Sequence, residues 1–175
     1  MDFEYRDDNG YRDPLWFVKK YFDKLNWYGL SMNESIPLEF FEEHLDKVNW
    51  YGLSRNTSIP LELFEKHLDV YDQSGLDSNE SKPDWDRLSY NASIPLKFFK
   101  KHLDEVNWKG LSSNPSIPLE FFEKHLDKVN WIGLSRNPSI PLEFFEKHLD
   151  KVNWNGLSRN TSIVDKPLNI KGAKR

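Results

Sequence analysis

The chain has 175 residues, enough for one domain of ordinary size, a net charge of −4 and no cysteine. The lack of cysteine excludes disulfides, thiolate metal sites and cysteine nucleophiles within this sequence. The acidic balance argues against a nucleic-acid backbone as the main partner. Hydrophobic residues make up 38% of the chain and aromatic residues 15%, and they recur at fixed positions. We therefore expect a thin, elongated core.

Residues 1–13 are polar and charged, and we interpret them as an N-terminal cap that contains the turn-forming sequence Asp7-Asp8-Asn9-Gly10. This segment has no apolar core of the signal-peptide type. Nowhere does the chain approach the roughly 18 consecutive apolar residues of a membrane span. We therefore expect a cytoplasmic protein without a signal peptide or a transmembrane segment.

Residues 14–163 consist of repeats. The clearest pair is PLEFFEKHLDKVNWIGLSRNPSI at 118–140 and PLEFFEKHLDKVNWNGLSRNTSI at 141–163, which differ at two positions. From Trp27 onward, tryptophans recur every 23 residues, except that 35 residues separate Trp50 from Trp85. A unit of about 23 residues is too small to form a core alone, so this periodicity predicts stacked repeats. The first unit, which starts at Pro14, is degenerate and has Tyr21 in place of a histidine.

The first half of each repeat, for example Pro37–Val48, predicts an α-helix. Its apolar residues recur at spacings of three and four, the pattern of one helical face: Leu38, Phe41, Leu45 and Val48. Pro37 suits the first helical turn, where no N–H is needed. The acidic Glu39 complements the helix dipole in that turn.

The second half predicts a short α or 3-10 helix. Asn49 is a suitable N-cap, Asp84 takes its place in the unit after the longer spacing, and Trp50 and Leu53 should face inward. A second asparagine follows each short helix, and we expect its side chain to bond backbone groups in a ladder along the stack. This set comprises Asn33, Asn56, Asn91, Asn114, Asn137 and Asn160.

These patterns predict an all-α solenoid of about six 23-residue repeats, in a single domain over residues 14–163. The longer spacing arises from Val70–Pro83, which is rich in Ser, Asp, Gly and Asn, and we interpret 70–83 as an inserted exposed loop. Residues 164–175 depart from the repeat and predict a basic C-terminal tail.

The repeat resembles two families. Leu134-Ser135, Asn137-Pro138, Pro141, Glu143-Phe144-Phe145, Leu149 and Asp150 resemble the leucine-rich-repeat variant family, whose units stack alternating α and 3-10 helices. Trp131, Leu134-Ser135, Asn137-Pro138, Ile140 and Glu143–His148 are similar to short helical repeats in giant DNA viruses. The period of 23 differs from the 24 of the first family, so the pitch does not carry over. The second resemblance implies a viral interaction protein, and neither implies a catalytic residue.

Three tempting patterns have a structural interpretation. The histidines recur once per repeat, too far apart to share a metal ion, so we place them at the edge of the core with one nitrogen bonding a neighbour: His44, His67, His102, His125 and His148. The sequons at Asn33, Asn56, Asn79, Asn91 and Asn160 are interpreted as turn chemistry. Carboxylates such as Glu42-Glu43 and Asp84/Asp86 lack a nucleophile or phosphate loop beside them. We expect no enzyme activity, cofactor or metal.

The repeats differ from one another mainly at two positions of the short helix, four residues apart and thus on one helical face. Neutral drift at solvent positions is one explanation, and a partner-binding surface is the other. The candidate residues are Tyr28, Met32, Tyr51, Arg55, Asp86, Tyr90, Lys109, Ile132, Arg136, Asn155 and Arg159, with Ser113 completing the rows. The outer charges of the first helices, which change sign from Lys19-Lys20 to Glu42-Glu43, are a weaker candidate and fit a solvated face.

Three functions remain open. The favoured one is a non-enzymatic scaffold for protein–protein interaction, using the variable positions and the 70–83 segment. The second is a nucleic-acid-binding repeat protein, which the arginines of the variable rows favour. The third is a self-stacking structural protein with end-to-end association, or an artificial array of consensus repeats. The near-identical final repeats favour it. No membrane partner is expected.

Overall fold

A computed structural model describes residues 10–74 and 82–164, with side chains described outside 69–74. The chain divides into two compact units, unit 1 (Met1–Asp84) and unit 2 (Trp85–Arg175). The predicted N-terminal cap lies largely, and the predicted C-terminal tail almost wholly, outside the described residues. The same holds for residues 75–81 of the insertion and for the sequon at Asn79. The assignment of residues 14–163 to one domain stays a prediction.

The described part of the chain consists of short helices joined by turns and irregular segments, which confirms the predicted all-α helical repeat. Unit 1 contains α1 (Trp16–Lys20), the 3-10 helix η2 (Phe22–Lys24), α2 (Trp27–Met32), α3 (Leu38–Glu42), α4 (Trp50–Leu53) and α5 (Leu61–Ser74). Unit 2 contains α6 (Trp85–Tyr90), α7 (Leu96–Lys101), α8 (Trp108–Ser113), α9 (Leu119–Glu123), α10 (Trp131–Arg136), α11 (Leu142–Glu146) and α12 (Trp154–Leu157).

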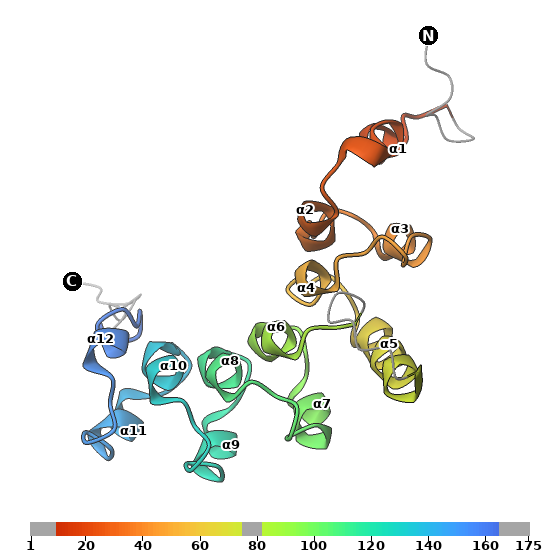
Figure 1. Ribbon diagram of the computed structural model, residues 1–175. Helices are drawn as coiled ribbons and strands as arrows, with labels where there is room; N and C mark the ends of the chain where they lie inside the picture. Colours follow the sequence, from red (N-terminus) through yellow and green to blue (C-terminus); the bar gives the residue numbers. More distant parts are fainter. Residues whose placement is uncertain (1–9, 75–81, 165–175) are drawn as a thin grey trace, which may run out of the picture. The chain divides into compact units, whose positions relative to one another are not determined.

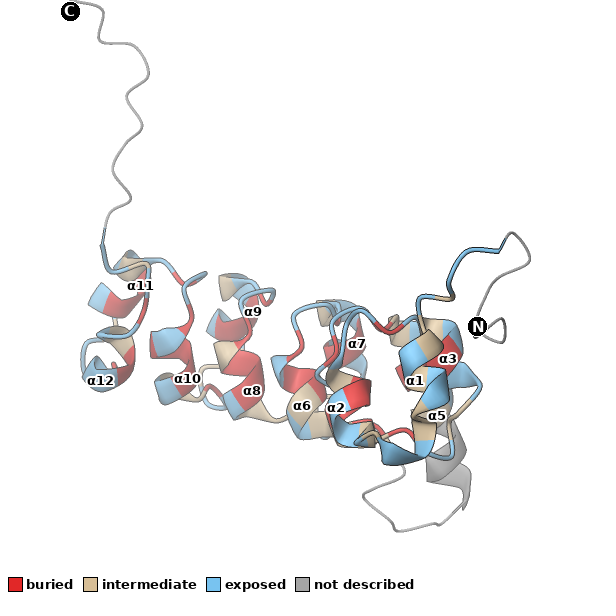
Figure 2. Ribbon diagram, turned by 90° about the horizontal axis from the view of Figure 1, so that it is seen from above, coloured by how far each residue is buried: buried red, intermediate tan, exposed pale blue. Residues whose placement is uncertain are grey.

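The helices of each unit form two rows, which Figure 1 shows for unit 2 as α6, α8, α10 and α12 beside α7, α9 and α11. We call α2, α4, α6, α8, α10 and α12 second helices, and α1, α3, α5, α7, α9 and α11 first helices. Neighbouring second helices make the closest helix–helix contacts in both units. The core lies between the rows, where buried residues occur in both helices of a repeat (Figure 2). Phe122, Leu111 and Leu134 have no exposed surface there.

A glycine in the second helix allows neighbouring second helices to approach closely. A Cβ atom placed on Gly133 would lie 2.8 Å from Lys109 O and 2.7 Å from Ser113 Oγ, both on α8. In unit 1, a Cβ atom on Gly52 would lie 2.9 Å from Tyr28 O. Carbon atoms do not approach oxygen this closely, so these contacts require glycine.

Asparagine and serine join neighbouring second helices within each unit. Asn130 caps α10, because its Oδ1 accepts the Gly133 N–H at 2.8 Å. The Asn130 backbone N–H donates to Ser112 Oγ at 3.0 Å, and this hydroxyl donates to Trp108 O at 2.6 Å. The cap is repeated at Asn26, Asn49, Asn107 and Asn153. The predicted N-caps are therefore confirmed at these asparagines, and Asp84 N–H makes the matching bond to Ser54 Oγ.

The predicted asparagine ladder is also confirmed. Asn137 Nδ2 donates to Ser112 O at 3.1 Å and to Asn114 O at 3.0 Å, both in the preceding repeat. Its Oδ1 accepts the backbone N–H and the hydroxyl of Ser139. Asn114 and Asn160 make the same pair of donations, and Asn56 donates to Ser31 O. A single amide thus satisfies backbone carbonyls that helix ends leave without a partner.

The second-helix tryptophans before Trp154 lie against the next first helix. Trp108 stacks on Phe121 with ring centroids 5.8 Å apart and an interplanar angle of 4°. His125 lies 5.5 Å from the same tryptophan, and its Nδ1 donates to Phe121 O at 2.8 Å. His44 and His67 bond the carbonyl four residues earlier in the same way. The prediction that the histidines lie at the core edge with one nitrogen bonded is confirmed at these three residues.

The first helices are shorter than predicted. The expected helix over Pro37–Val48 is wrong beyond Glu42, because α3 ends there and turns follow. The His44 ring donates to Phe40 O, while the His44 backbone N–H bonds Phe41 O at 3.1 Å. The imidazole thus bonds the acceptor that a continuing helix would use, but the same bond at His67 does not end α5, so it does not by itself stop the helix. The chain must also reach the extended backbone of the Asn49 cap within a few residues.

The predicted loop over 70–83 is wrong at its start, because residues 70–74 belong to α5. His67 bonds Leu63 O as His44 and His125 bond their carbonyls, yet α5 continues to Ser74. The difference is that this repeat has extra residues before its next cap, at Asp84. The first half of the repeat thus favours a longer helix. In the other repeats, the short connection to the next N-cap ends that helix early. Pro83 is buried at the far end of the insertion.

Replacing Gly133 by alanine should destabilise the protein by about 1–3 kcal/mol, because the new methyl group overlaps Lys109 O and Ser113 Oγ. Gly29 is the matched control: its nearest neighbour to a Cβ atom is Asn26 Oδ1 at 3.9 Å. Gly29→Ala should stabilise the protein by about 0.5–1 kcal/mol, because alanine favours helix. Urea unfolding measures both changes. Equal effects of the two substitutions would contradict the close approach at Gly133.

Replacing Asn137 by alanine should cost about 2–4 kcal/mol, because Ser112 O and Asn114 O lose their buried donor. Asn33 has the same place in the first repeat but is exposed, and its Oδ1 bonds Ser35 N–H. Asn33→Ala should therefore cost less than about 1 kcal/mol. Thermal and urea unfolding of both variants test the ladder. A small loss at Asn137 would show that water replaces the amide.

Candidate interaction surface

The variable positions are the second and sixth residues counted from the tryptophan of each second helix, and in α4 and α12 the sixth residue lies just beyond the end of the helix. The fourth residue is a leucine that packs between the rows, for example Leu111 and Leu134, which are fully buried. Successive residues turn by about 100° around a helix, so positions two and six point away from the leucine. We call these side chains the variable face: Tyr28, Met32, Tyr51 and Arg55 in unit 1, and Asp86, Tyr90, Lys109, Ser113, Ile132, Arg136, Asn155 and Arg159 in unit 2.

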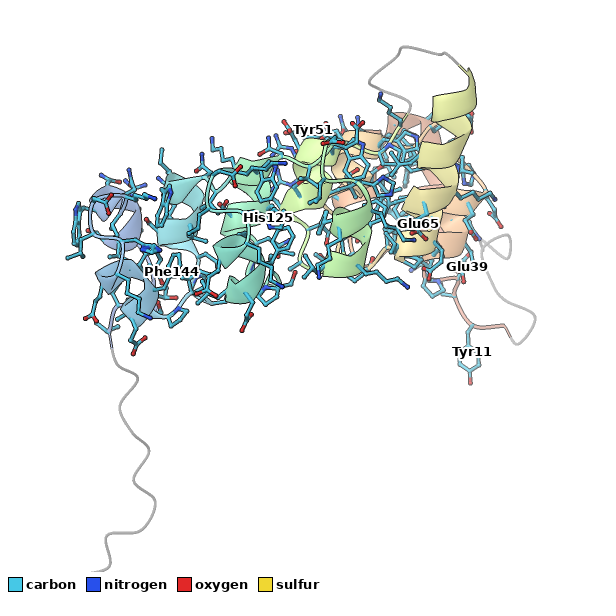
Figure 3. The ribbon with its side chains drawn as sticks, turned by 90° about the horizontal axis from the view of Figure 1, so that it is seen from below. Tyr11, Glu39, Tyr51, Glu65, His125 and Phe144 are labelled. Carbon is cyan, nitrogen blue, oxygen red and sulfur yellow. The ribbon has the colours of Figure 1, made fainter. Side chains whose placement is uncertain are left out.

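In unit 1 the variable face is mainly aromatic. The rings of Tyr28 and Tyr51 have centroids 6.0 Å apart at an angle of 34°, so they form a pair across α2 and α4. Figure 3 labels Tyr51 among these side chains. Met32 is half-buried and Arg55 is exposed. The structure therefore brings the two predicted tyrosines together.

In unit 2 the variable face carries exposed apolar and cationic groups. Tyr90 is 40% exposed and Ile132 is 44% exposed, although the leucine two positions on from Ile132 is fully buried. Lys109, Arg136 and Arg159 are exposed, as are Asp86 and Asn155. Ser113 is half-buried and donates to Lys109 O. All the predicted residues of unit 2 thus lie on accessible surface.

Local contacts hold two of these side chains in place. Asp86 Oδ1 accepts a hydrogen bond from Asn107 Nδ2 at 2.6 Å. The Tyr90 ring lies over Gly110, since a Cβ atom on that glycine would be 3.0 Å from Tyr90 Cδ2. The close approach of second helices therefore also positions a tyrosine of the variable face.

The charge of the variable face is opposite to that of the whole chain. Its cations are Arg55, Lys109, Arg136 and Arg159, and its one carboxylate is Asp86, whereas the chain has a net charge of −4. Two carboxylates of unit 1 have lowered pKa values, and neither belongs to this face. The Lys19 ammonium lowers the pKa of Asp13, and hydrogen bonds from Thr57 lower that of Glu34.

The row of first helices forms a second surface in unit 2. A hollow between α7 and α9 is lined by Leu96, Lys100, Leu103, Pro118, Glu120, Phe121, Lys124 and His125. Its outer charges alternate between lysine and glutamate, as expected for a solvated face. The wider separation of first helices leaves this space, while the second helices pack closely.

No protein-family model, curated protein or solved structure matches the chain. Within residues 10–74 and 82–164, no three or more histidine, aspartate or glutamate side chains gather in a group that could hold a metal ion. No described helix has the length and apolar character needed to cross a bilayer.

Trp154 differs from the sequence-based expectation. We expected each second-helix tryptophan to face inward, but Trp154 is 59% exposed. Its counterpart Trp131 stacks on Phe144 at 5.8 Å and contacts His148 at 5.6 Å. The described residues supply no such phenylalanine and histidine to Trp154. The exposure of Trp154 could have been predicted from the sequence, because residues 155–175 contain no PLEFFEKH segment on which it could stack.

Trp131→Ala should lower the free energy of unfolding by about 3 kcal/mol, because a stacked aromatic side chain is removed. Trp154→Ala should lower it by less than about 1 kcal/mol, because most of that ring is already exposed. The two tryptophans occupy the same repeat position, so the comparison isolates the following first helix. Urea unfolding at low protein concentration measures both, and similar losses would contradict the assigned exposure.

Proposed function

We propose that this chain is a non-catalytic repeat scaffold that binds a protein partner through its variable face. The observation that carries the proposal is the match between variation and exposure. In α8, α10 and α12, which read WKGLSS, WIGLSR and WNGL followed by Ser-Arg, the unchanged residues make the junctions between repeats. The residues that differ point away from the core.

The chemistry of the variable face supports a protein partner. Tyrosine, isoleucine and arginine are exposed together on it, and tyrosine and arginine are enriched where proteins bind one another. Tyr90 and Ile132 are 40% and 44% exposed, and we take them as the contact residues of this face rather than as products of neutral drift. The partner would cover these two side chains.

The cations of the face indicate the partner's charge. Four cationic side chains and one carboxylate, on an acidic protein, favour a segment that carries both carboxylates and apolar side chains. Asp86 is already bonded to Asn107, so the cations of unit 2 are the groups best placed to pair with such a segment. We therefore propose an acidic, amphipathic protein segment as the ligand.

We place this binding in the cytoplasm, and in the host cytoplasm if the similarity to giant-virus repeats reflects common descent. No catalytic step, cofactor or membrane contact is part of the proposal.

A photo-crosslinking amino acid at position 90 or 132 tests the proposal in cells. We expect the same protein to be captured from both positions and not from position 146, where Glu146 is exposed on a first helix. Arg136→Glu with Arg159→Glu should lower the capture at least about tenfold, because two attractive charges become repulsive. Capture of the same proteins from position 146 would contradict the assigned face.

The cationic residues also favour a second candidate, a nucleic-acid ligand. Fluorescence anisotropy with labelled single-stranded RNA at low and high salt distinguishes the two. Binding that weakens steeply with salt and is lost in the Arg136→Glu, Arg159→Glu variant would replace the protein partner by a nucleic acid.

A further inference from the structure

Every junction described between consecutive repeats of unit 2 uses the same set of contacts. A tryptophan stacks on the phenylalanine and histidine of the next first helix, and a serine hydroxyl accepts the N–H of the next N-cap. An asparagine amide donates back to two carbonyls, and a glycine allows the preceding second helix to approach closely. At the α10–α12 junction the bonded pairs are Asn153 N–H with Ser135 Oγ, at 3.0 Å, and Asn160 Nδ2 with Ser135 O and Asn137 O.

The last repeat of unit 2 exposes one half of this junction. Trp154 is 59% exposed and Leu149 is 55% exposed. The Ser158 hydroxyl donates to Trp154 O at 2.7 Å, as the Ser112 hydroxyl does to Trp108 O. The Ser158 oxygen is therefore oriented to accept an N–H, as the Ser112 oxygen accepts that of Asn130. We call these residues, with the Asn160 carbonyl, the C-terminal face.

The first repeat of unit 1 exposes the other half. Phe17 is 49% exposed and its ring lies 4.7 Å from that of Tyr21. The equivalent pair in a stacked repeat, Phe121 and His125, has centroids 4.6 Å apart. Asn33 is exposed, whereas Asn137 at the same repeat position is fully buried. We call Phe17, Tyr21, Asn26, Gly29 and Asn33 the N-terminal face.

We propose that a second copy of this chain docks head to tail, its N-terminal face on the C-terminal face of the first copy. Phe17 and Tyr21 of one copy then stack on Trp154 of the other. The Asn26 N–H donates to Ser158 Oγ, and Asn33 Nδ2 donates to Ser158 O and Asn160 O. Each pair reproduces one that the internal junctions make between repeats.

Charge supports this pairing. In unit 2, Lys128 lies 5.7 Å from the centre of the Trp108 ring and Lys151 lies 5.7 Å from that of Trp131. Lys24 has the same repeat position in the N-terminal face, and it already lies 5.7 Å from the Tyr21 ring. Docking brings this cation over Trp154, whose exposed π-face attracts it.

Gly29 provides an independent argument. Glycine weakens a helix, and at internal junctions it is needed because the preceding helix approaches within about 3 Å of the missing Cβ atom. At Gly29 the nearest neighbour is Asn26 Oδ1 at 3.9 Å, so nothing described in this chain requires glycine there. A docked second copy would require glycine at this position. In the α10–α12 junction, Gly156 faces Ile132 O and Ser135 Cβ. In the docked pair, Gly29 would face the equivalent atoms of the other copy, Asn155 O and Ser158 Cβ.

The two faces differ from each other, so the contact is heterologous and each copy retains a free face after one contact. Such a contact builds rings or open chains. Association also loses translational and rotational freedom, which the covalent junctions do not. We therefore expect self-association that depends on protein concentration.

Sedimentation velocity of the full chain over a range of concentrations tests the proposal. The wild-type protein should form species larger than a dimer as concentration rises. Trp154→Ala and Phe17→Ala should each weaken self-association at least about tenfold, because aromatic anchors dominate such contacts. An equimolar mixture of the two variants should form a one-to-one dimer, since each variant keeps the face that the other lacks.

Gly29→Ala separates docking from folding. It should stabilise the monomer and yet weaken self-association, because its methyl group meets the incoming carbonyl. Glu123→Ala is the control, since it removes an exposed side chain of α9 that belongs neither to the terminal faces nor to the variable face, and it should leave association unchanged. Urea unfolding of each variant confirms that it folds.

Three results would overturn the proposal. The first is a wild-type chain that stays monomeric at every concentration. The second is a loss of association in Trp154→Ala alone, with Phe17→Ala and Gly29→Ala unaffected, which would indicate a symmetric tail-to-tail contact. The third is protection of Trp154 from acrylamide quenching in a monomer, measured as the difference between wild type and Trp154→Phe, which would show that the same chain covers this face.

Discussion

The structure depends on the need to satisfy the backbone groups at the ends of very short helices. Helices of four to six residues leave most of their N–H and C=O groups without an intrahelical partner. Here side chains of the neighbouring repeat supply those partners: an asparagine amide for two carbonyls and a serine hydroxyl for an N–H. The repeats therefore stabilise one another through polar groups as much as through aromatic packing, and no single repeat would hold its helices alone.

The repeat pattern allowed much of this fold to be predicted. The period, the two helices per repeat, the capping asparagines and the ladder follow from residues at fixed spacing, because each has one chemical role that recurs. The length of the first helices could not be predicted from periodicity. Leu45 and Val48 continue the helical spacing, but the short connection to Asn49 requires extended backbone within a few residues. The continuation of α5 to Ser74 shows the result when that connection is longer.

The sequence was sufficient to predict which positions form the candidate surface, but not which of their side chains contact one another. Ile132 and Arg136 could be identified because their positions vary between repeats. The invariant residues around them form the contacts at the repeat junctions. The pairing of Tyr28 with Tyr51, and the packing of Tyr90 on Gly110, depend on how closely second helices approach. That distance follows from glycine contacts with a neighbouring backbone, which a sequence pattern does not display. The exposure of Phe17 and Trp154 likewise depends on which repeats have a neighbour.

Because each junction involves only adjacent repeats, a repeat can be copied without disturbing the others. The segments 118–140 and 141–163 differ at two positions, Ile132/Asn155 and Pro138/Thr161, and neither pair includes a side chain that forms the ladder or the cap. An in-frame duplication of 69 nucleotides (three for each of about 23 residues, the repeat length that stacking permits) would thus yield a longer protein that folds at once. Selection could then act on two side chains per copy while the scaffold stays fixed, so the length of the array and the chemistry of its variable face can evolve separately.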